Sequence, residues 1–370
     1  MVSSLGFGGF QVIPPPPPAV GPGRLGGTTK LTVVTDWEPD VLAGYWQRTF
    51  ELGPDPDGEG RLVATLVRRG EAEPSASAVL AVHGFTDYFF HTDLADHFAS
   101  RGFAFYALDL HKCGRSWREG QTPHFTTDLA RYDRELERAL DVIGAGSEVL
   151  VYGHSAGGLI VSLWLDRLRR RGQTQRKGVT GLVLNSPWLD LQGPPYLRAA
   201  PTAAAIAALS RMRKMSVVRP PTAEGGYGST LHRDYSGEFD YNLKWKPIGG
   251  FPVTFGWINA IRRGHAKLHR GLDVGVPNLI LRSDRSVREV ADPDVIQRGD
   301  AVLDVKQIAR WAGCIGNRTT VAPIADAKHD VFLSVPESRQ SAYAELDRWL
   351  DWYLAETSDP TTQPEQGATR

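Results

Sequence analysis

A serine at position 155 stands in the sequence Gly153-His154-Ser155-Ala156-Gly157, between an apolar run at residues 149–151 and a helical pattern at 159–165. A Gly-x-Ser-x-Gly pattern at a strand-to-helix junction forces the serine into a strained turn that exposes its hydroxyl at the carboxyl edge of a sheet. The two glycines carry no Cβ, so the strand and the helix can approach closely around that turn. Ala156 begins the helix, and its backbone N–H points to where negative charge develops on an attacked carbonyl. The pattern therefore predicts a nucleophilic serine with one oxyanion donor, and its position disfavours a glycine-rich turn without function.

A serine hydroxyl is a poor nucleophile until a base takes its proton, and in this arrangement the base is a histidine that follows the acid along the chain. Of the ten histidines, His329 follows the last predicted strand and precedes the last predicted helix, whereas His232 lies far from any predicted strand. We expect His329 to be the base. His265 and His269 have metal-ligand spacing, but no base stands between them, so a solvated basic helix face is favoured and no metal site is expected.

The acid must follow the strand predicted at residues 276–282, so that its carboxylate can orient the imidazole. Asp284 comes directly after that strand, and Asp300 comes later, before a helix start. We favour Asp300 over Asp284; residues 285–299 then form a polar insert, and Asp304 caps the helix.

The second oxyanion donor is expected in the loop after the strand at residues 78–83. The turn at His83-Gly84 in the sequence VHGFTD would aim the backbone N–H of Phe85 at the same pocket. Alone, this pair of residues indicates only a tight turn. Together with Ser155 and His329 at suitable chain positions, it supports the same site.

The elements that must position these residues alternate between short apolar runs and helical periodicity. Fully apolar strands that alternate with helices predict an α/β fold with a mostly parallel, doubly wound sheet, preceded by an antiparallel hairpin at 45–52 and 61–68. The segment 188–275 has no clear strand and is predicted to cap the carboxyl ends of the strands. Strands are expected at 78–83, 103–110, 148–152, 179–184, 276–282 and 320–324, and helices at 92–100, 129–143, 156–171, 305–312 and 337–354.

The bulk composition bounds the partners and the compartment. Acidic and basic residues balance at 42 each, which argues against nucleic acid as a partner. Two cysteines, no recognisable signal sequence and no apolar run of about 20 residues favour a soluble, cytoplasmic protein. The Gly- and Pro-rich leader at 1–30 and the polar tail at 359–370 read as disordered, and the leader as a spacer rather than a docking site. The core α/β domain is predicted at 31–187 and 276–358.

These motifs resemble those of α/β-hydrolases near the monoacylglycerol lipase, lysophospholipase and serine-aminopeptidase-like group. The resemblance rests on VHGFTDYFFHTDLADHFASRGFAFYALDLHKCGRS, LVYGHSAGG, LVLNSPWLDL and AKHDVFLS, and covers residues 45–355. It implies Ser155 as nucleophile, His329 as base, Phe85 and Ala156 as oxyanion donors, and no cofactor. The sequence departs from the family pattern in three places. Lys112-Cys113 replace the usual glycine and histidine, an insert interrupts the region of the acid, and the cap does not match a familiar lid. The resemblance therefore does not determine the shape of that loop, the identity of the acid or the specificity of the cap.

The expected function is a serine hydrolase for lipophilic carboxylic esters, such as monoacylglycerol-like, lysophospholipid-like or short-chain acyl esters. Two alternatives stay open: an amide or peptide hydrolase of the aminopeptidase-like type, and a non-catalytic protein that binds a small molecule or partner. Most cap aromatics are expected to form the cap's own core, and some to line an acyl pocket. Residues 203–218 could contact a membrane surface, but a helix packed on the sheet is favoured.

Overall fold

A computed structural model describes residues 37–70, 75–144, 146–222, 226–288 and 292–358 of the 370-residue chain. The predicted leader at 1–30 and the tail at 359–370 lie outside the described residues.

A nine-stranded sheet runs through the molecule in the order β1-β2-β3-β5-β4-β6-β7-β10-β11. The pairs from β5 onward are parallel, and β1, β2 and β3 join the edge antiparallel. This is the α/β-hydrolase fold, and it confirms the predicted fold class. The strands are β1 (Glu38–Pro39), β2 (Tyr45–Pro54), β3 (Arg61–Arg69), β4 (Ser77–Val82), β5 (Ala104–Asp109), β6 (Glu148–His154), β7 (Val179–Asn185), β10 (Asn278–Ser283) and β11 (Thr319–Ile324).

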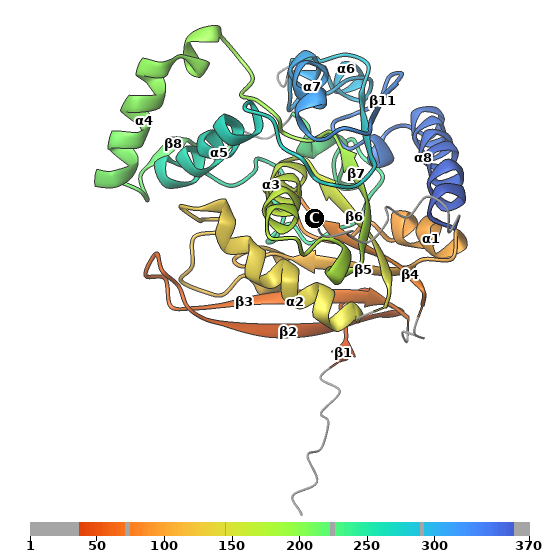
Figure 1. The fold of residues 1–370 in the computed structure, drawn as a ribbon. Coiled ribbons are helices and arrows are strands. Elements are labelled where there is room, and N and C mark those ends of the chain that lie inside the picture. Colours follow the sequence, from red (N-terminus) through yellow and green to blue (C-terminus); the bar gives the residue numbers. More distant parts are fainter. Residues whose placement is uncertain (1–36, 71–74, 145, 223–225, 289–291, 359–370) are drawn as a thin grey trace, which may run out of the picture. The chain divides into compact units, whose positions relative to one another are not determined.

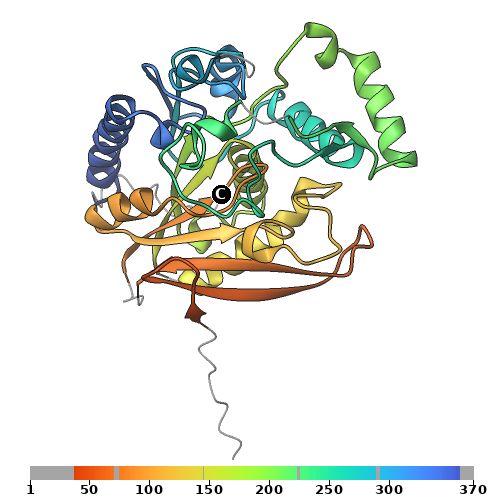
Figure 2. The same cartoon turned by 180° about the vertical axis from the view of Figure 1, so that it is seen from behind.

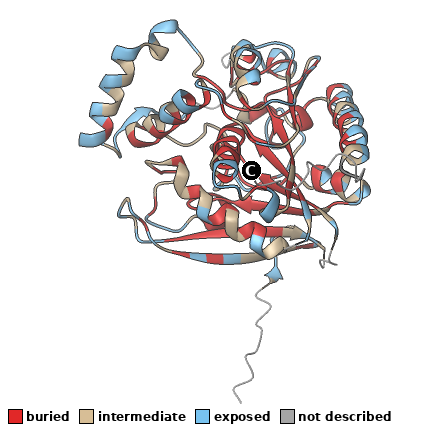
Figure 3. Cartoon of the chain, in the orientation of Figure 1, coloured by how far each residue is buried: buried red, intermediate tan, exposed pale blue. Residues whose placement is uncertain are grey.

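The central strands are apolar because both faces of the sheet are covered. Leu136 of α2 and Leu163 of α3 belong to the buried cluster on one face, and Phe98 of α1 and Leu346 of α8 belong to the cluster on the other (Figure 1). In Figure 3 the central strands are accordingly buried along most of their length. The helices are α1 (Thr92–Ser100), α2 (Asp133–Ile143), α3 (Ala156–Arg170), α4 (Ala200–Met212), α5 (Phe255–Leu268), α6 (Pro293–Ile296), α7 (Val305–Trp311) and α8 (Pro336–Ser358).

The predicted hairpin is present as β2 and β3, which pair antiparallel with one irregularity, between Glu51 and Gly53. Its turn is fastened by buried ion pairs, since the Lys112 ammonium lies 2.7 Å from Asp55 and 2.6 Å from Glu59. Lys214, which follows α4, lies 3.0 Å from Asp57 in the same turn. The turn therefore reaches the region of α4, as Figure 2 shows from behind. Lys112 thus fixes the loop whose shape the sequence left open.

One predicted helix begins later than its periodicity suggested. Residues 129–143 were expected as a single helix, but Leu129–Tyr132 form a 3₁₀ turn and the α-helix starts at Asp133. The side chain of Asp128 accepts from the Ala130 N–H and favours the tighter first turn. The apolar periodicity continues through both parts, so the pattern could not distinguish them.

The segment 188–275, predicted as a cap, contains α4, α5 and a small antiparallel pair formed by β8 (Val217–Arg219) and β9 (Val253–Thr254). The favoured packing of residues 203–218 on the sheet is wrong. Helix α4 packs against α5, and Ser210 is its one buried residue (Figure 1, Figure 3). The helix is rich in alanine, whose methyl groups bury little apolar area.

His265 in α5 and His269, which directly follows this helix, do not form the solvated basic face that was favoured. The Nε2 atom of His265 lies 2.8 Å from the Trp188 carbonyl oxygen, and that of His269 lies 2.9 Å from the Leu189 carbonyl oxygen. Burial lowers the pKa of His265 to about 4, so its ring is neutral at pH 7. The two rings fasten α5 to the chain that leaves β7.

Candidate active site

Ser155 stands at the turn between β6 and α3 with φ 53° and ψ −120°, in a region that residues with a side chain rarely adopt. Glycines make this turn possible. A Cβ on Gly157 would lie 2.3 Å from the carbonyl oxygen of His83, and one on Gly153 would lie 2.9 Å from the Cα of Gly158. The close approach and the backbone strain expected from the sequence are both present at Ser155.

His329 follows β11 and faces a buried carboxylate. Its Nδ1 lies 3.0 Å from Oδ2 of Asp300, whose side chain is fully buried. The other oxygen, Oδ1, accepts from the backbone N–H groups of Val302 at 2.8 Å and Leu303 at 2.7 Å. An ionised carboxylate can only accept, so Nδ1 carries the proton of the neutral ring and Nε2 keeps a free lone pair. That is the tautomer a general base requires.

The chain brings Asp300 to this position by closing a loop. After β10 it leaves the sheet and returns at a parallel bridge between Ser286 and Asp300. The Asp300 N–H donates to the Arg285 carbonyl at 3.0 Å, and the Asp300 carbonyl accepts from Val287 at 2.9 Å. Arg285 and Asp300 are 15 residues apart in the sequence, and these bonds bring them into contact beside the end of β10.

Asp284, the alternative acid, faces another partner. Its Oδ1 accepts from the Asp326 N–H at 3.1 Å, and its Oδ2 lies 3.0 Å from the Arg285 guanidinium. The structure therefore pairs His329 with Asp300, the favoured residue of the two. Asp304 caps α7 by accepting from the Lys306 N–H at 3.0 Å, as expected.

The two expected oxyanion donors flank the serine. A Cβ on Gly84 would lie 2.9 Å from the Cβ of Ser155, so the peptide that leads into Phe85 passes directly beside the nucleophile. Ala156 is the first residue of α3, and the first N–H groups of a helix have no partner within it. In the described part of the chain, the Phe85 N–H donates to no other group.

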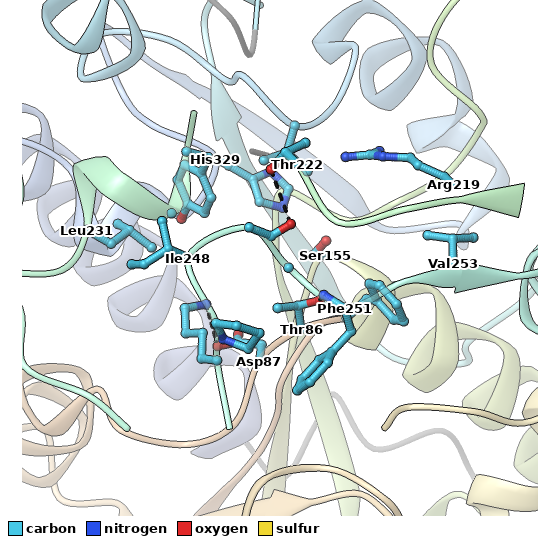
Figure 4. Close-up of a pocket in the computed structure, with 18 of the residues that line it drawn as sticks. Thr86, Asp87, Ser155, Arg219, Thr222, Leu231, Ile248, Phe251, Val253 and His329 are labelled. Carbon is cyan, nitrogen blue, oxygen red and sulfur yellow. Dashed lines mark hydrogen bonds and ion pairs between the residues drawn. The ribbon is translucent and has the colours of Figure 1, made fainter. Parts of the chain in front are cut away.

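Ser155, His329 and Phe85 line one pocket of about 160 Å³, together with residues of segment 188–275 (Figure 4). Aromatic side chains form much of one wall. The Phe85 ring lies 4.0 Å from that of Trp257 in α5, which lies 5.6 Å from that of Trp188. The rest of the lining is largely apolar and includes Leu231, Ile248, Phe251 and Val253.

The aromatic residues of segment 188–275 divide between two roles. Tyr241 is buried in a small cluster that Phe239 and Trp245 join, but Tyr88, Phe90 and Leu333 from outside the segment belong to it too, so this cluster joins the segment to the rest of the fold and is not a core of its own. Tyr227, Tyr241, Phe251 and Trp257 line the pocket. Tyr196 and Tyr235 are exposed and belong to neither group.

Contacts on both sides hold the segment around His329. The Asp330 N–H donates to the Tyr227 hydroxyl at 3.1 Å, and the Lys328 ammonium donates to the Thr230 carbonyl at 2.9 Å. Burial lowers the pKa of Lys328 to about 8. The sequence reasoning missed Lys328, although its place beside His329 was a signal that could have drawn attention to it.

The pocket also contains an ion pair that sequence reasoning missed. Asp87 lies two residues after Phe85, and its Oδ1 is 2.7 Å from the Nζ of Lys246. Burial disfavours the charged carboxylate, yet the Lys246 ammonium lowers the pKa of Asp87 to about 2. The position of Asp87 beside the HGF turn was a weak signal for this residue, but nothing in the sequence indicated Lys246.

One group of metal-ligating types lies outside the pocket lining. His83, Cys113 and His124 are buried and present ligand atoms within 4.8 Å of one another. However, Nε2 of His83 accepts from the Leu110 N–H at 3.1 Å, and Nδ1 lies 2.8 Å from the Gly84 carbonyl. Both ring nitrogens of His83 are thus used, and this donor set does not fit a metal ion.

Comparison with known proteins gives the family and the fold. A family model described as serine aminopeptidase, S33, matches residues 73–285. No curated protein matches the chain at a significant level. Within the described part of the chain, no helix is both long enough and apolar enough to cross a bilayer.

Several solved structures are similar in fold. A soluble variant of monoglyceride lipase from Saccharomyces cerevisiae, in complex with a substrate analog, has a TM-score of 0.56 and 17% identity, over 83% of this chain and 94% of that one. A lipase in its open form has a TM-score of 0.54 and 15% identity, over 83% of this chain and 99% of that one. The protein DcsB with its substrate analogue has a TM-score of 0.53 and 13% identity, over 83% and 99%. At sequence identities this low, the similarity establishes the fold and not the activity.

Proposed function

The chain belongs to the serine aminopeptidase S33 family of α/β-hydrolases, and from this premise we propose that it is a serine hydrolase of carboxylic esters. The observation that carries the proposal is one pocket lined by both Ser155, in a strained turn, and His329, whose Nδ1 faces Asp300 at 3.0 Å. These are the parts that make a serine hydroxyl nucleophilic.

The proposed reaction begins when Ser155 Oγ attacks the ester carbonyl and His329 Nε2 takes the hydroxyl proton. Asp300 holds the ring and stabilises the imidazolium that forms. The backbone N–H groups of Phe85 and Ala156 stabilise the oxyanion, and His329 then protonates the leaving alcohol. Water, activated by the same histidine, releases the acid from the acyl-enzyme.

The pocket supports a lipophilic ester of modest size. Its lining is mainly apolar and aromatic, which favours an uncharged acyl group. Its volume of about 160 Å³ is below the roughly 300–1,000 Å³ of pockets that hold drug-sized ligands. Among the proposed substrate classes, we therefore favour short-chain acyl esters over esters of long fatty acids.

Amide cleavage is the second candidate, because the family model is named for an aminopeptidase. An aminopeptidase needs a carboxylate to hold the substrate ammonium. Asp87 is the one carboxylate among the described residues that line the pocket, and it is already paired with Lys246. This arrangement favours the ester.

The test compares p-nitrophenyl butyrate with fluorogenic aminoacyl amides, using the wild type and Ser155→Ala. We expect ester hydrolysis that Ser155→Ala lowers by at least ~10³-fold, with little turnover of the amides. Preferred hydrolysis of amides would favour the second candidate. If the wild type hydrolyses no ester and no amide and does not react with a fluorophosphonate, the non-catalytic binding role is favoured.

A further inference from the structure

The loop that carries Phe85 has a backbone that its own sequence does not favour. Thr86 has φ 54°, although it is a β-branched residue. Such a conformation persists only where the surrounding structure holds it. Because Gly84 lies against Ser155, any relaxation of Thr86 would move the Phe85 N–H relative to the nucleophile.

Three consecutive side chains of this loop contact one stretch of segment 188–275, residues 242–251. The Thr86 hydroxyl accepts from the Phe251 N–H at 2.9 Å. The Tyr88 hydroxyl accepts from the Asn242 N–H at 2.7 Å, and between them Asp87 accepts from Lys246 at 2.7 Å. Figure 4 shows Thr86 and Asp87 on the same side of the pocket, with a dashed line from Asp87 to its ion-pair partner.

Of the three contacts, the ion pair joins two charged groups, and it lies largely out of solvent. The side chains of Asp87 and Lys246 are each 11% exposed. Around the ammonium stand the rings of Phe90, at 5.6 Å, and Tyr241, at 5.8 Å. If one of the two charged groups is removed, the other is left buried without a counter-charge, which destabilises its position.

We propose that Lys246 is a positioning residue for hydrolysis: through Asp87 it holds residues 85–88 so that the Phe85 N–H points at the substrate oxyanion. The inference rests on the proposed function and adds a part to it. Segment 242–251 therefore has two roles. It lines the pocket, and it also contributes to transition-state stabilisation because it holds the loop at residues 85–88 in place.

The expected effect is on kcat and not on KM, because the oxyanion exists only after Ser155 has attacked the ester. A donor that is displaced acts on the transition state and scarcely on the bound ester. Lys246→Met should therefore lower kcat for p-nitrophenyl butyrate by about 10–100-fold and leave KM within about 3-fold, given that a complete donor is worth ~10²–10³. Affinity for a trifluoromethyl ketone, which forms an oxyanion on Ser155, should fall by a similar factor.

Lys244→Met is the matched control. Lys244 is two residues away in the same segment, is exposed, and has its ammonium 5.4 Å from the Trp117 ring. It should keep kcat within about 2-fold. All rates are divided by the concentration of active sites, titrated with a fluorophosphonate, so a smaller folded fraction does not imitate a lower kcat.

Two further variants separate positioning from general stability. Lys246→Arg should recover most of kcat because the charge remains, and Asp87→Asn combined with Lys246→Met should lose little more than Lys246→Met alone. If Lys246→Met does not fold, Tyr88→Phe carries the test. It removes the acceptor for the Asn242 N–H and should lower kcat by about 3–10-fold with KM unchanged.

The proposal is overturned if Lys246→Met keeps kcat within 2-fold per active site, or loses activity through KM alone. With a non-folding Lys246→Met, an unchanged kcat in Tyr88→Phe overturns it. The proposed function fails by a different observation, namely a wild type whose hydrolysis survives Ser155→Ala. The two failures are therefore distinguishable.

Discussion

Replacing Asp300 with asparagine tests the acid of the proposed triad. In the wild type, Oδ1 accepts two backbone N–H groups and Oδ2 faces Nδ1 of His329. An asparagine amide has one oxygen and one NH₂ group. Placing the NH₂ group against the two N–H groups would oppose donors to donors, so the amide oxygen stays there and the NH₂ group faces His329.

The expected loss of kcat follows from the tautomer of the His329 ring. Facing an NH₂ donor, Nδ1 of His329 must accept, so the neutral ring carries its proton on Nε2 and cannot take the proton of Ser155. A wrong tautomer in a serine triad lowers kcat by ~10⁴-fold, equivalent to about 5.5 kcal/mol of transition-state stabilisation. The two backbone hydrogen bonds remain, so the variant should fold.

The assay is kcat for p-nitrophenyl butyrate, with thermal unfolding as the check on folding. Asp284→Asn is the matched control, because Asp284 pairs with Arg285 and the Asp326 N–H. It should keep activity within about 3-fold. The reasoning is refuted if Asp300→Asn keeps more than a tenth of wild-type kcat, or if Asp284→Asn loses as much.

Two other changes test the pocket and the buried lysine beside His329. Trp257→Ala removes a ring that packs against Phe85 and lines the pocket, so the ratio of kcat/KM for the octanoate ester to that for the butyrate ester should rise at least 10-fold. An unchanged ratio would place the acyl chain elsewhere. Burial lowers the pKa of Lys328 from 10.5 to about 8, so between these pH values the unfolded chain binds more protons and stability rises with pH. In denaturant unfolding, the wild type should gain up to about 3 kcal/mol over Lys328→Met from pH 8 to pH 10.5, and a constant difference would contradict the burial argument.

Much of the fold was predictable because its signals are local. Six apolar runs and five helical patterns correspond to strands and helices of the structure, with ends that differ by a few residues. The turn at Ser155 was predictable for the same reason, since glycines and a strand-to-helix change occur within seven residues. Helix α4 was not, because an alanine-rich sequence does not say which neighbour it packs against.

The candidate site was predictable where chain order constrains it. His329 was identified by its place after the last strand. Asp300 required a choice, since the return of the chain to Ser286 is a tertiary contact with no pattern of its own. Lys246 was beyond prediction, because its partner lies 159 residues earlier and a single lysine in a polar segment resembles any other.

The most direct measurement of the central claim is the mass of the enzyme during turnover. Intact mass spectrometry of wild type quenched after mixing with p-nitrophenyl butyrate, followed by peptide mapping, should find a butyryl group on Ser155, and His329→Ala should lower its rate of formation by at least ~10³-fold. An acyl group on another residue, or ester hydrolysis with no acyl-enzyme under conditions that trap one in a known serine esterase, would contradict the account.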